Sequence, residues 1–127
     1  MAGNLSDYLE NKLLDHFLGT TSYTMPATVY VGLYTVAPTD AGGGTQVTGG
    51  SYARQTAAFA AASSGATSNS ANIDFAGMPA ATTVAIGVFD ALTAGNLLLW
   101  GTLTTNKTTD AGDTLRIATG DLDISID

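Results

Sequence analysis

Apolar side chains recur with the period of an α-helix over one short stretch of this chain, and with the period of a β-strand after it. In residues 4–19, NLSDYLENKLLDHFLG, four apolar residues are spaced four apart and cover an arc of about 120° on a helix. From residue 28 on, apolar and polar residues alternate in short runs that end in turn residues. We therefore expect one N-terminal amphipathic α-helix over residues 4–19 and a β-sandwich over residues 28–127.

The β part divides into short predicted strands at nearly regular spacing. They cover residues 28–36, 51–62, 72–77, 82–91, 96–104, 114–118 and 121–127. Because no helical segment lies between them, a parallel sheet with crossover helices is disfavoured. The pattern is typical of an antiparallel sandwich or barrel. We expect a mainly β, antiparallel, jelly-roll-like β-sandwich in a single domain over residues 1–127, with a strand order that the sequence leaves open.

The predicted strands differ in how regularly apolar and polar residues alternate. The last one, DLDISID, would turn Leu122, Ile124 and Ile126 inward. Three other strands contain a glycine in their interior, at Gly32, Gly87 and Gly101, close to aromatic residues. Glycine weakens a strand unless another group packs closely over it. We expect neighbouring rings to cover these glycines, and a ligand groove is the alternative.

The residues that usually carry catalysis are scarce. The chain has no cysteine and one histidine, His16, so thiol chemistry, zinc–thiolate sites and histidine clusters are excluded. It contains neither a G-x-S-x-G elbow nor a glycine-rich loop followed by GK[ST]. Asp110 and Asp113 lie in a turn but lack the spacing of a calcium loop, and solvated turn carboxylates are favoured. We expect no enzyme activity, no cofactor and no metal.

Charge and hydropathy restrict the partners. The formal net charge is −7, with only four basic residues, and these are scattered along the sequence. Nucleic-acid binding requires a clustered basic surface, so we expect no nucleic-acid partner. No run of apolar residues is long enough to cross a membrane, so we expect no membrane partner. The acidic surface favours solubility, or docking onto a basic protein surface.

The predicted helix carries more apolar surface than one contact needs. A helix that lies on a single sheet requires one apolar stripe, but Leu14 and Leu18 fall outside the stripe, about 120–160° from its centre. The second patch predicts a contact with another copy of the chain or with a different protein. The candidate interface residues are Leu5, Leu9, Leu13, Leu14, Phe17 and Leu18.

Several segments, in order along almost the whole chain, carry a resemblance to a known family. They are LSDYLENKLLDHFLG, PATVYVGLYTVAPTDAGGG, GGSYARQ, GVFDA, GNLLLWGTLTT and AGDTLRIATGDLDISID. Together they resemble a family of small tailed-bacteriophage virion proteins, whose members are often labelled phage tail fibre proteins. The resemblance implies a non-enzymatic structural protein located in the virion after assembly in the host cytoplasm.

The resemblance leaves the position in the virion open. The leading interpretation is an oligomeric capsid decoration or cement subunit, a homotrimer in contact with the major capsid protein. The alternative is a tail-associated subunit, in a tail fibre, tip or baseplate, which contacts other tail proteins and the host surface. A carbohydrate-binding module that uses Trp100 and the tyrosines as stacking platforms is a third interpretation.

Overall fold

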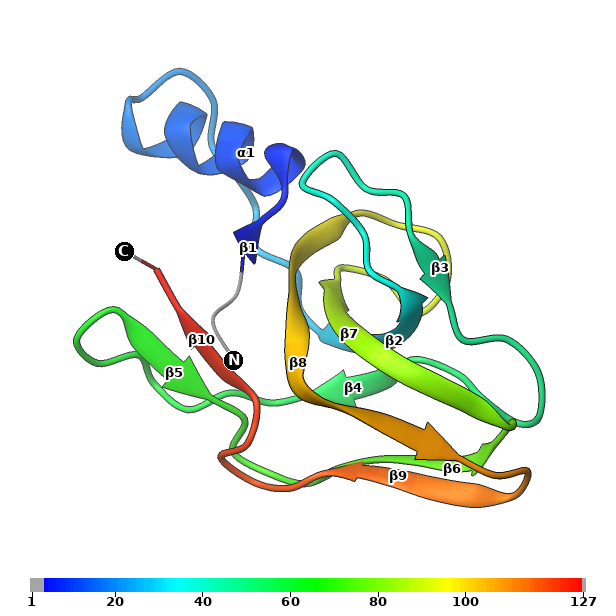
Figure 1. The fold of residues 1–127 in the computed structure, drawn as a ribbon. Coiled ribbons are helices and arrows are strands. Elements are labelled where there is room, and N and C mark those ends of the chain that lie inside the picture. Colours follow the sequence, from blue (N-terminus) through cyan, green and yellow to red (C-terminus); the bar gives the residue numbers. More distant parts are fainter. Residues whose placement is uncertain (1–3, 127) are drawn as a thin grey trace.

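The computed structural model describes residues 4–126, which form mainly antiparallel strands and one helix (Figure 1). This arrangement confirms the expected fold class. The elements are β1 (Asn4–Leu5), α1 (Asp7–Phe17), β2 (Val29–Val36), β3 (Thr45–Gln46), β4 (Gln55–Ala57), β5 (Ala66–Ser68), β6 (Ile73–Met78), β7 (Ala81–Phe89), β8 (Leu97–Thr109), β9 (Asp113–Ile117) and β10 (Asp123–Ser125).

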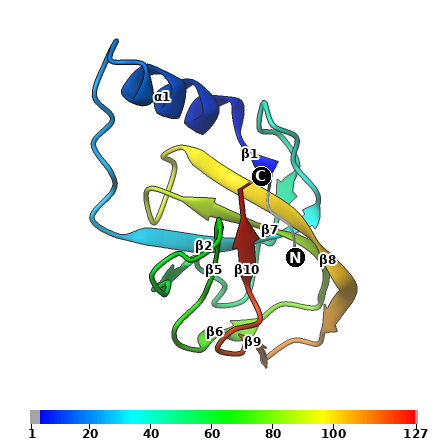
Figure 2. The same cartoon turned by 90° about the vertical axis from the view of Figure 1, so that its left-hand side faces the viewer.

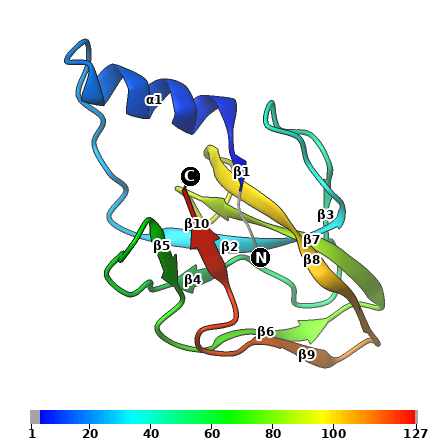
Figure 3. The same ribbon diagram turned by 60° about the vertical axis from the view of Figure 1, so that its left-hand side comes forward.

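One large sheet and two ribbons make a sandwich-like arrangement. The large sheet has the order β1-β8-β7-β2-β3, with β4 also paired to β2. The ribbons are the antiparallel pairs β6–β9 and β5–β10. Figures 2 and 3 show the β6–β9 ribbon on one side of the large sheet and α1 on the other. The hydrophobic core lies between the large sheet and the two ribbons.

The alternation predicted for residues 28–36 is confirmed. Val31 and Leu33 point into the core and are 0% exposed, whereas Tyr34 belongs to a second cluster with Ala85 and Phe89. Successive side chains of a strand point to opposite faces, so β2 contributes to both clusters. Apolar residues of the ribbons close the core from the other side: Ile73, Phe75, Leu115, Leu122 and Ile124.

Aromatic rings cover two of the three strand glycines, as expected. Gly32 and Gly87 lie directly opposite each other on β2 and β7. A Cβ atom at Gly87 would lie 2.9 Å from the Tyr34 ring and 3.1 Å from the Phe89 ring, and one at Gly32 would lie 3.0 Å from Phe89. The glycines therefore make room for aromatic packing on the outer face of the sheet.

Arg54 completes this packing. Its guanidinium lies 3.5 Å from the centre of the Phe89 ring, a cation–π contact. The same group donates hydrogen bonds to the carbonyl oxygens of Ala91 and Ala94, at 2.9 and 2.8 Å. Burial lowers the pKa of Arg54, and the nearby Tyr52 oxygen opposes that shift. Arg54 thus fixes the β7–β8 loop against the face of the sheet.

The pairing of β7 with β8 shifts register in the middle of the ladder. Thr83 pairs with Lys107, whereas Ala85 pairs with Thr102, so that Val84 alone lies opposite residues 103–106. The extra residues of β8 form a large bulge. The bulge bends the strand and turns side chains to the other face. The strand predicted over residues 96–104 therefore continues past the bulge to Thr109.

Other predicted boundaries were wrong. The helix begins at Asp7 instead of residue 4, because Asn4 and Leu5 pair with Trp100 and Leu99 as a short strand. The predicted strand over residues 51–62 is reduced to β4, since its alanines bury too little area to hold a longer ladder.

The ends of the predicted strands also differ. The loop predicted over residues 37–50 includes β3, and the loop predicted over residues 63–71 includes β5. Leu122 and Ile124 point inward as expected, but Ile126 is 58% exposed because it lies beyond the end of β10.

Asn69 joins the loop before β6 to the segment between β9 and β10. Its side chain is buried and donates to the carbonyl oxygens of Ala71 and Ala118, both at 2.9 Å. Its carbonyl oxygen accepts a hydrogen bond from the Leu122 backbone N–H at 2.9 Å. The bond from the Leu122 N–H is buried, whereas the Ala118 carbonyl also accepts from the Asp121 N–H at 3.0 Å.

We predict that Asn69→Leu destabilises the fold by about 1–3 kcal/mol, because the buried Leu122 backbone N–H would be left without its hydrogen-bond partner. Urea unfolding followed by tryptophan fluorescence measures the loss. The matched control is Asn72→Leu, whose side chain is exposed and accepts from the Thr119 N–H at 2.9 Å. Equal losses in both variants would contradict the role of Asn69.

We predict that Gly87→Val costs about 1–3 kcal/mol, because the added methyl groups would overpack the Tyr34 and Phe89 rings. Ala76→Val on β6, at an exposed position, is the control and should change stability by less than about 0.5 kcal/mol. Thermal unfolding measures both variants. A neutral Gly87→Val would mean that the rings do not require the glycine.

Candidate functional site

The N-terminal end of α1 is anchored to strand β8. Ser6 is the N-cap residue, and its hydroxyl accepts a hydrogen bond from the Leu9 N–H at 3.2 Å. The same hydroxyl donates to the Leu97 carbonyl at 2.5 Å, and the Ser6 N–H donates to the Leu98 carbonyl at 2.9 Å. Ser6 is buried, so the start of the helix is fixed to the edge of the sheet.

A second anchor involves the loop between β2 and β3. The Asp7 N–H donates to the Asp40 carbonyl at 2.8 Å, and the Trp100 indole N–H donates to the Asp40 carboxylate at 3.0 Å. Asp40 therefore joins the first turn of α1 to β8. The Trp100 side chain serves this structural contact and is half-buried.

The first half of α1 packs against the hydrophobic core of its own chain. Tyr8 and Leu9 contact the hydrophobic core, and Leu13 is half-buried. Lys12 lies on the same side, with its amino group 5.6 Å from the centre of the Tyr8 ring. The candidate residues Leu9 and Leu13 thus belong to the internal packing of the chain, and Leu5 lies in β1 and not on the helix.

The last turn of α1 exposes its apolar side chains. Leu14 is 56% exposed, Phe17 is 73% exposed and Leu18 is 77% exposed. We call these three residues the α1 apolar end. They are spaced three and four apart, so they share one face of the helix. Figure 3 shows that this end of the helix lies away from the strands.

Phe17 lies on the same helical stripe as Leu9 and Leu13 in the sequence, but its side chain is 73% exposed. The helix is fixed to the sheet only at its first turns, and its last turn extends past the surface that Leu9 covers. Phe17 therefore joins Leu14 and Leu18, and the spare apolar patch is larger than the sequence indicated.

The chain leaves the helix by a well-defined turn. The Leu18 N–H donates to the Leu14 carbonyl at 3.0 Å, and Gly19 has a φ of +79°, the conformation that glycine favours after a helix.

His16 has a structural role, because its Nδ1 accepts a hydrogen bond from the Tyr23 N–H at 3.1 Å. Partial burial raises the pKa of Tyr23, and Tyr8 and Asp90 add to that shift.

Met25, in the segment after this turn, is also highly exposed. Sequence reasoning missed this residue because it lies outside any periodic pattern. An isolated methionine in a segment of loop residues carries no signal of exposure.

Residues 4–126 hold no other cluster of chemically active groups. No set of three or more His, Cys, Asp or Glu side chains in that range is arranged to bind a metal ion. Asp110 and Asp113 close a turn, since the Asp113 carboxylate accepts from the Asp110 N–H at 2.8 Å. In the same part of the chain no helix has the length and hydropathy to cross a membrane.

Comparison with known proteins identifies the family. The family model described as "Podophage GP4 fiber I protein gp80" matches residues 4–125. No curated protein sequence matches the chain. The resemblance to phage tail fibre proteins is thereby confirmed, and a phage fibre protein is a component of the virion. Because the match covers nearly the whole sequence, the chain belongs to the podophage GP4 fiber I protein gp80 family.

Proposed function

We propose that this protein is a non-enzymatic subunit of a phage tail fibre and that its copies associate through the α1 apolar end. The observation that supports the proposal is the exposure of Leu14, Phe17 and Leu18 on a helix whose first half is anchored to the sheet. A folded protein in water gains nothing from three large apolar side chains at one exposed helix end. Such a patch marks a surface that another protein covers.

The expected gain is of the same order as the cost of assembly. Burial of a leucine or phenylalanine side chain contributes about 1.5–3 kcal/mol. If three copies bury their apolar ends together, the gross gain is on the order of 15–25 kcal/mol, against an association cost of about 4–15 kcal/mol for each subunit added. A homotrimer brings three such ends to one axis, and its symmetry lets one patch form every contact.

Negative charge on the rest of the surface opposes association through any face other than the apolar end. The net charge is −7, and of the four basic residues Lys12 lies over Tyr8, Arg54 lies over Phe89 and Arg116 is bound to Asp74. Acidic copies repel one another over most of their surfaces, so association needs an apolar patch that outweighs the repulsion. The same charge disfavours binding of nucleic acid or of an anionic membrane surface.

A capsid decoration subunit is the second candidate. Its support is the small size of the chain and the mainly β fold, which suit a clamp on a capsid shell. The description of the matching family, a fibre protein, favours the tail. The apolar end would then contact a capsid protein instead of other copies of the chain. The two candidates make the same prediction for the fold and different predictions for the location in the virion.

We predict that the double variant Leu14→Gln with Leu18→Gln dissociates the oligomer into single chains while the fold is kept. Both residues are exposed, so the loss of packing inside one chain should be below about 1 kcal/mol. Glutamine has a helix propensity close to that of leucine and avoids an acidic charge at the C-terminal end of the helix. Light scattering after size exclusion measures the mass, and circular dichroism measures the fold.

The control is Leu92→Gln, at another exposed leucine in the β7–β8 loop, which should leave the oligomer intact. An unchanged mass for the helix double variant would contradict the proposed interface. A monomeric unmodified protein would contradict self-association and direct the search to a different virion protein as the partner.

A further inference from the structure

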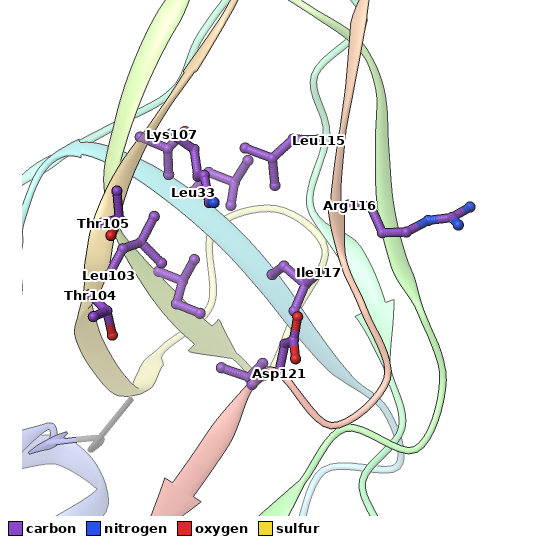
Figure 4. A pocket seen from close by; sticks show the side chains of 12 residues that line it. Leu33, Leu103, Thr104, Thr105, Lys107, Leu115, Arg116, Ile117 and Asp121 are labelled. Carbon is purple, nitrogen blue, oxygen red and sulfur yellow. The ribbon is translucent and has the colours of Figure 1, made fainter.

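A pocket lies between the bulge of β8 and strand β9, on the side of the molecule opposite α1 (Figure 4). Its volume is about 270 Å³. Half of the lining residues are aliphatic: Leu33, Ile86, Leu103, Leu115, Ile117 and Leu122. The other half are polar or charged: Thr83, Thr104, Thr105, Lys107, Arg116 and Asp121. A pocket that combines apolar surface with polar groups is the usual form of a small-molecule site.

The β8 bulge places two of these polar residues on the inner face of the sheet. Thr83 and Lys107 are direct partners in the β7–β8 ladder, so their side chains lie on the same face. Without the shift of register between Thr83 and Ala85, strict alternation would turn Thr83 to the outer face with Ala85 and Phe89. The bulge thus turns a hydroxyl and an ammonium group toward an aliphatic surface.

Both groups lack a partner within residues 4–126. The Thr83 hydroxyl is completely buried and makes no hydrogen bond there, which normally costs about 1–3 kcal/mol. The Lys107 side chain is exposed and makes neither an ion pair nor a hydrogen bond in that range, in a chain that is strongly acidic. Figure 4 shows the Lys107 side chain extending into the pocket, whereas Arg116, which is paired with Asp74, points away from it.

We propose that this pocket binds a small aliphatic carboxylate. Its anionic head would pair with the Lys107 ammonium, and its hydrocarbon body would lie on the aliphatic floor. Asp121 lies at the far side of the pocket from Lys107, by Ile117, so repulsion from its carboxylate orients the head toward Lys107 (Figure 4). The proposal does not depend on how the subunit assembles.

The lining argues against other ligand classes. Sugars are usually held by stacking on aromatic rings, and none of the pocket residues is aromatic. Nucleotide phosphates carry several negative charges, whereas a single unpaired cation faces this pocket. The volume equals that of about nine water molecules in the liquid, which suits a chain of roughly eight carbons.

Lys107 could instead have a structural role in protecting a strand edge, and that role leads to a different prediction. Lysines and bulges on edge strands deter pairing with other chains. In that case Lys107 would protect the exposed edge of β8 from edge-to-edge association, and its removal would promote aggregation without any effect on a ligand.

Titration of the isotope-labelled full chain with octanoate tests the proposal by NMR. We expect the amide signals of Leu33, Lys107 and Leu115 to shift, and octan-1-ol to bind about tenfold more weakly because it lacks the charge. Lys107→Met should weaken octanoate binding about tenfold and remove the preference over octanol, whereas Lys107→Arg should keep both. Lys12→Met is the control and should bind octanoate like the unmodified chain.

Thr83→Val supplies an independent readout. We expect a higher melting temperature, because the unpaired buried hydroxyl is removed, together with octanoate affinity close to that of the unmodified chain. The proposal is overturned if octanoate shifts no pocket signals, if octanol binds equally well, or if Lys107→Met retains full affinity. Aggregation of Lys107→Met without octanoate binding to the unmodified chain would also overturn it, in favour of edge protection.

Discussion

The antiparallel ladder between β7 and β8 determines where both exposed features of this protein lie. At one end of β8, the carbonyl groups of Leu97 and Leu98 accept the hydrogen bonds of Ser6 and so fix the start of α1. Farther along β8, the bulge at residues 103–106 opens the pocket and turns Lys107 inward. If the ladder slipped by one residue, every β8 side chain would change face, and both features would be lost together.

The sequence predicted the fold class and the helix because hydrophobic periodicity is a local signal. The alternation of Val29, Val31 and Leu33 and the packing of rings over Gly32 and Gly87 follow from residue type and spacing alone. The start of the helix cannot be predicted from residue type and spacing, because it depends on the pairing of β1 with a strand about ninety residues away. Asn4 and Ser6 are both good N-cap residues, and only that distant pairing selects Ser6.

The two candidate surfaces differ in how far the sequence predicts them. The spare apolar patch at Leu14 and Leu18 can be read from the helical wheel, although Phe17 cannot be assigned to it without the direction of the helix axis. The pocket leaves no readable pattern. Residues 102–109, TLTTNKTT, are almost uniformly polar, so neither the bulge nor the inward turn of Lys107 shows as a break in alternation.

The central claim is that the chain is a tail-fibre subunit held through the α1 apolar end. Cryo-electron microscopy of intact virions tests both parts of this claim at once. The account predicts density for this fold on the tail, with Leu14, Phe17 and Leu18 buried against neighbouring copies. Density on the capsid shell, or a tail position in which α1 faces solvent, would contradict it.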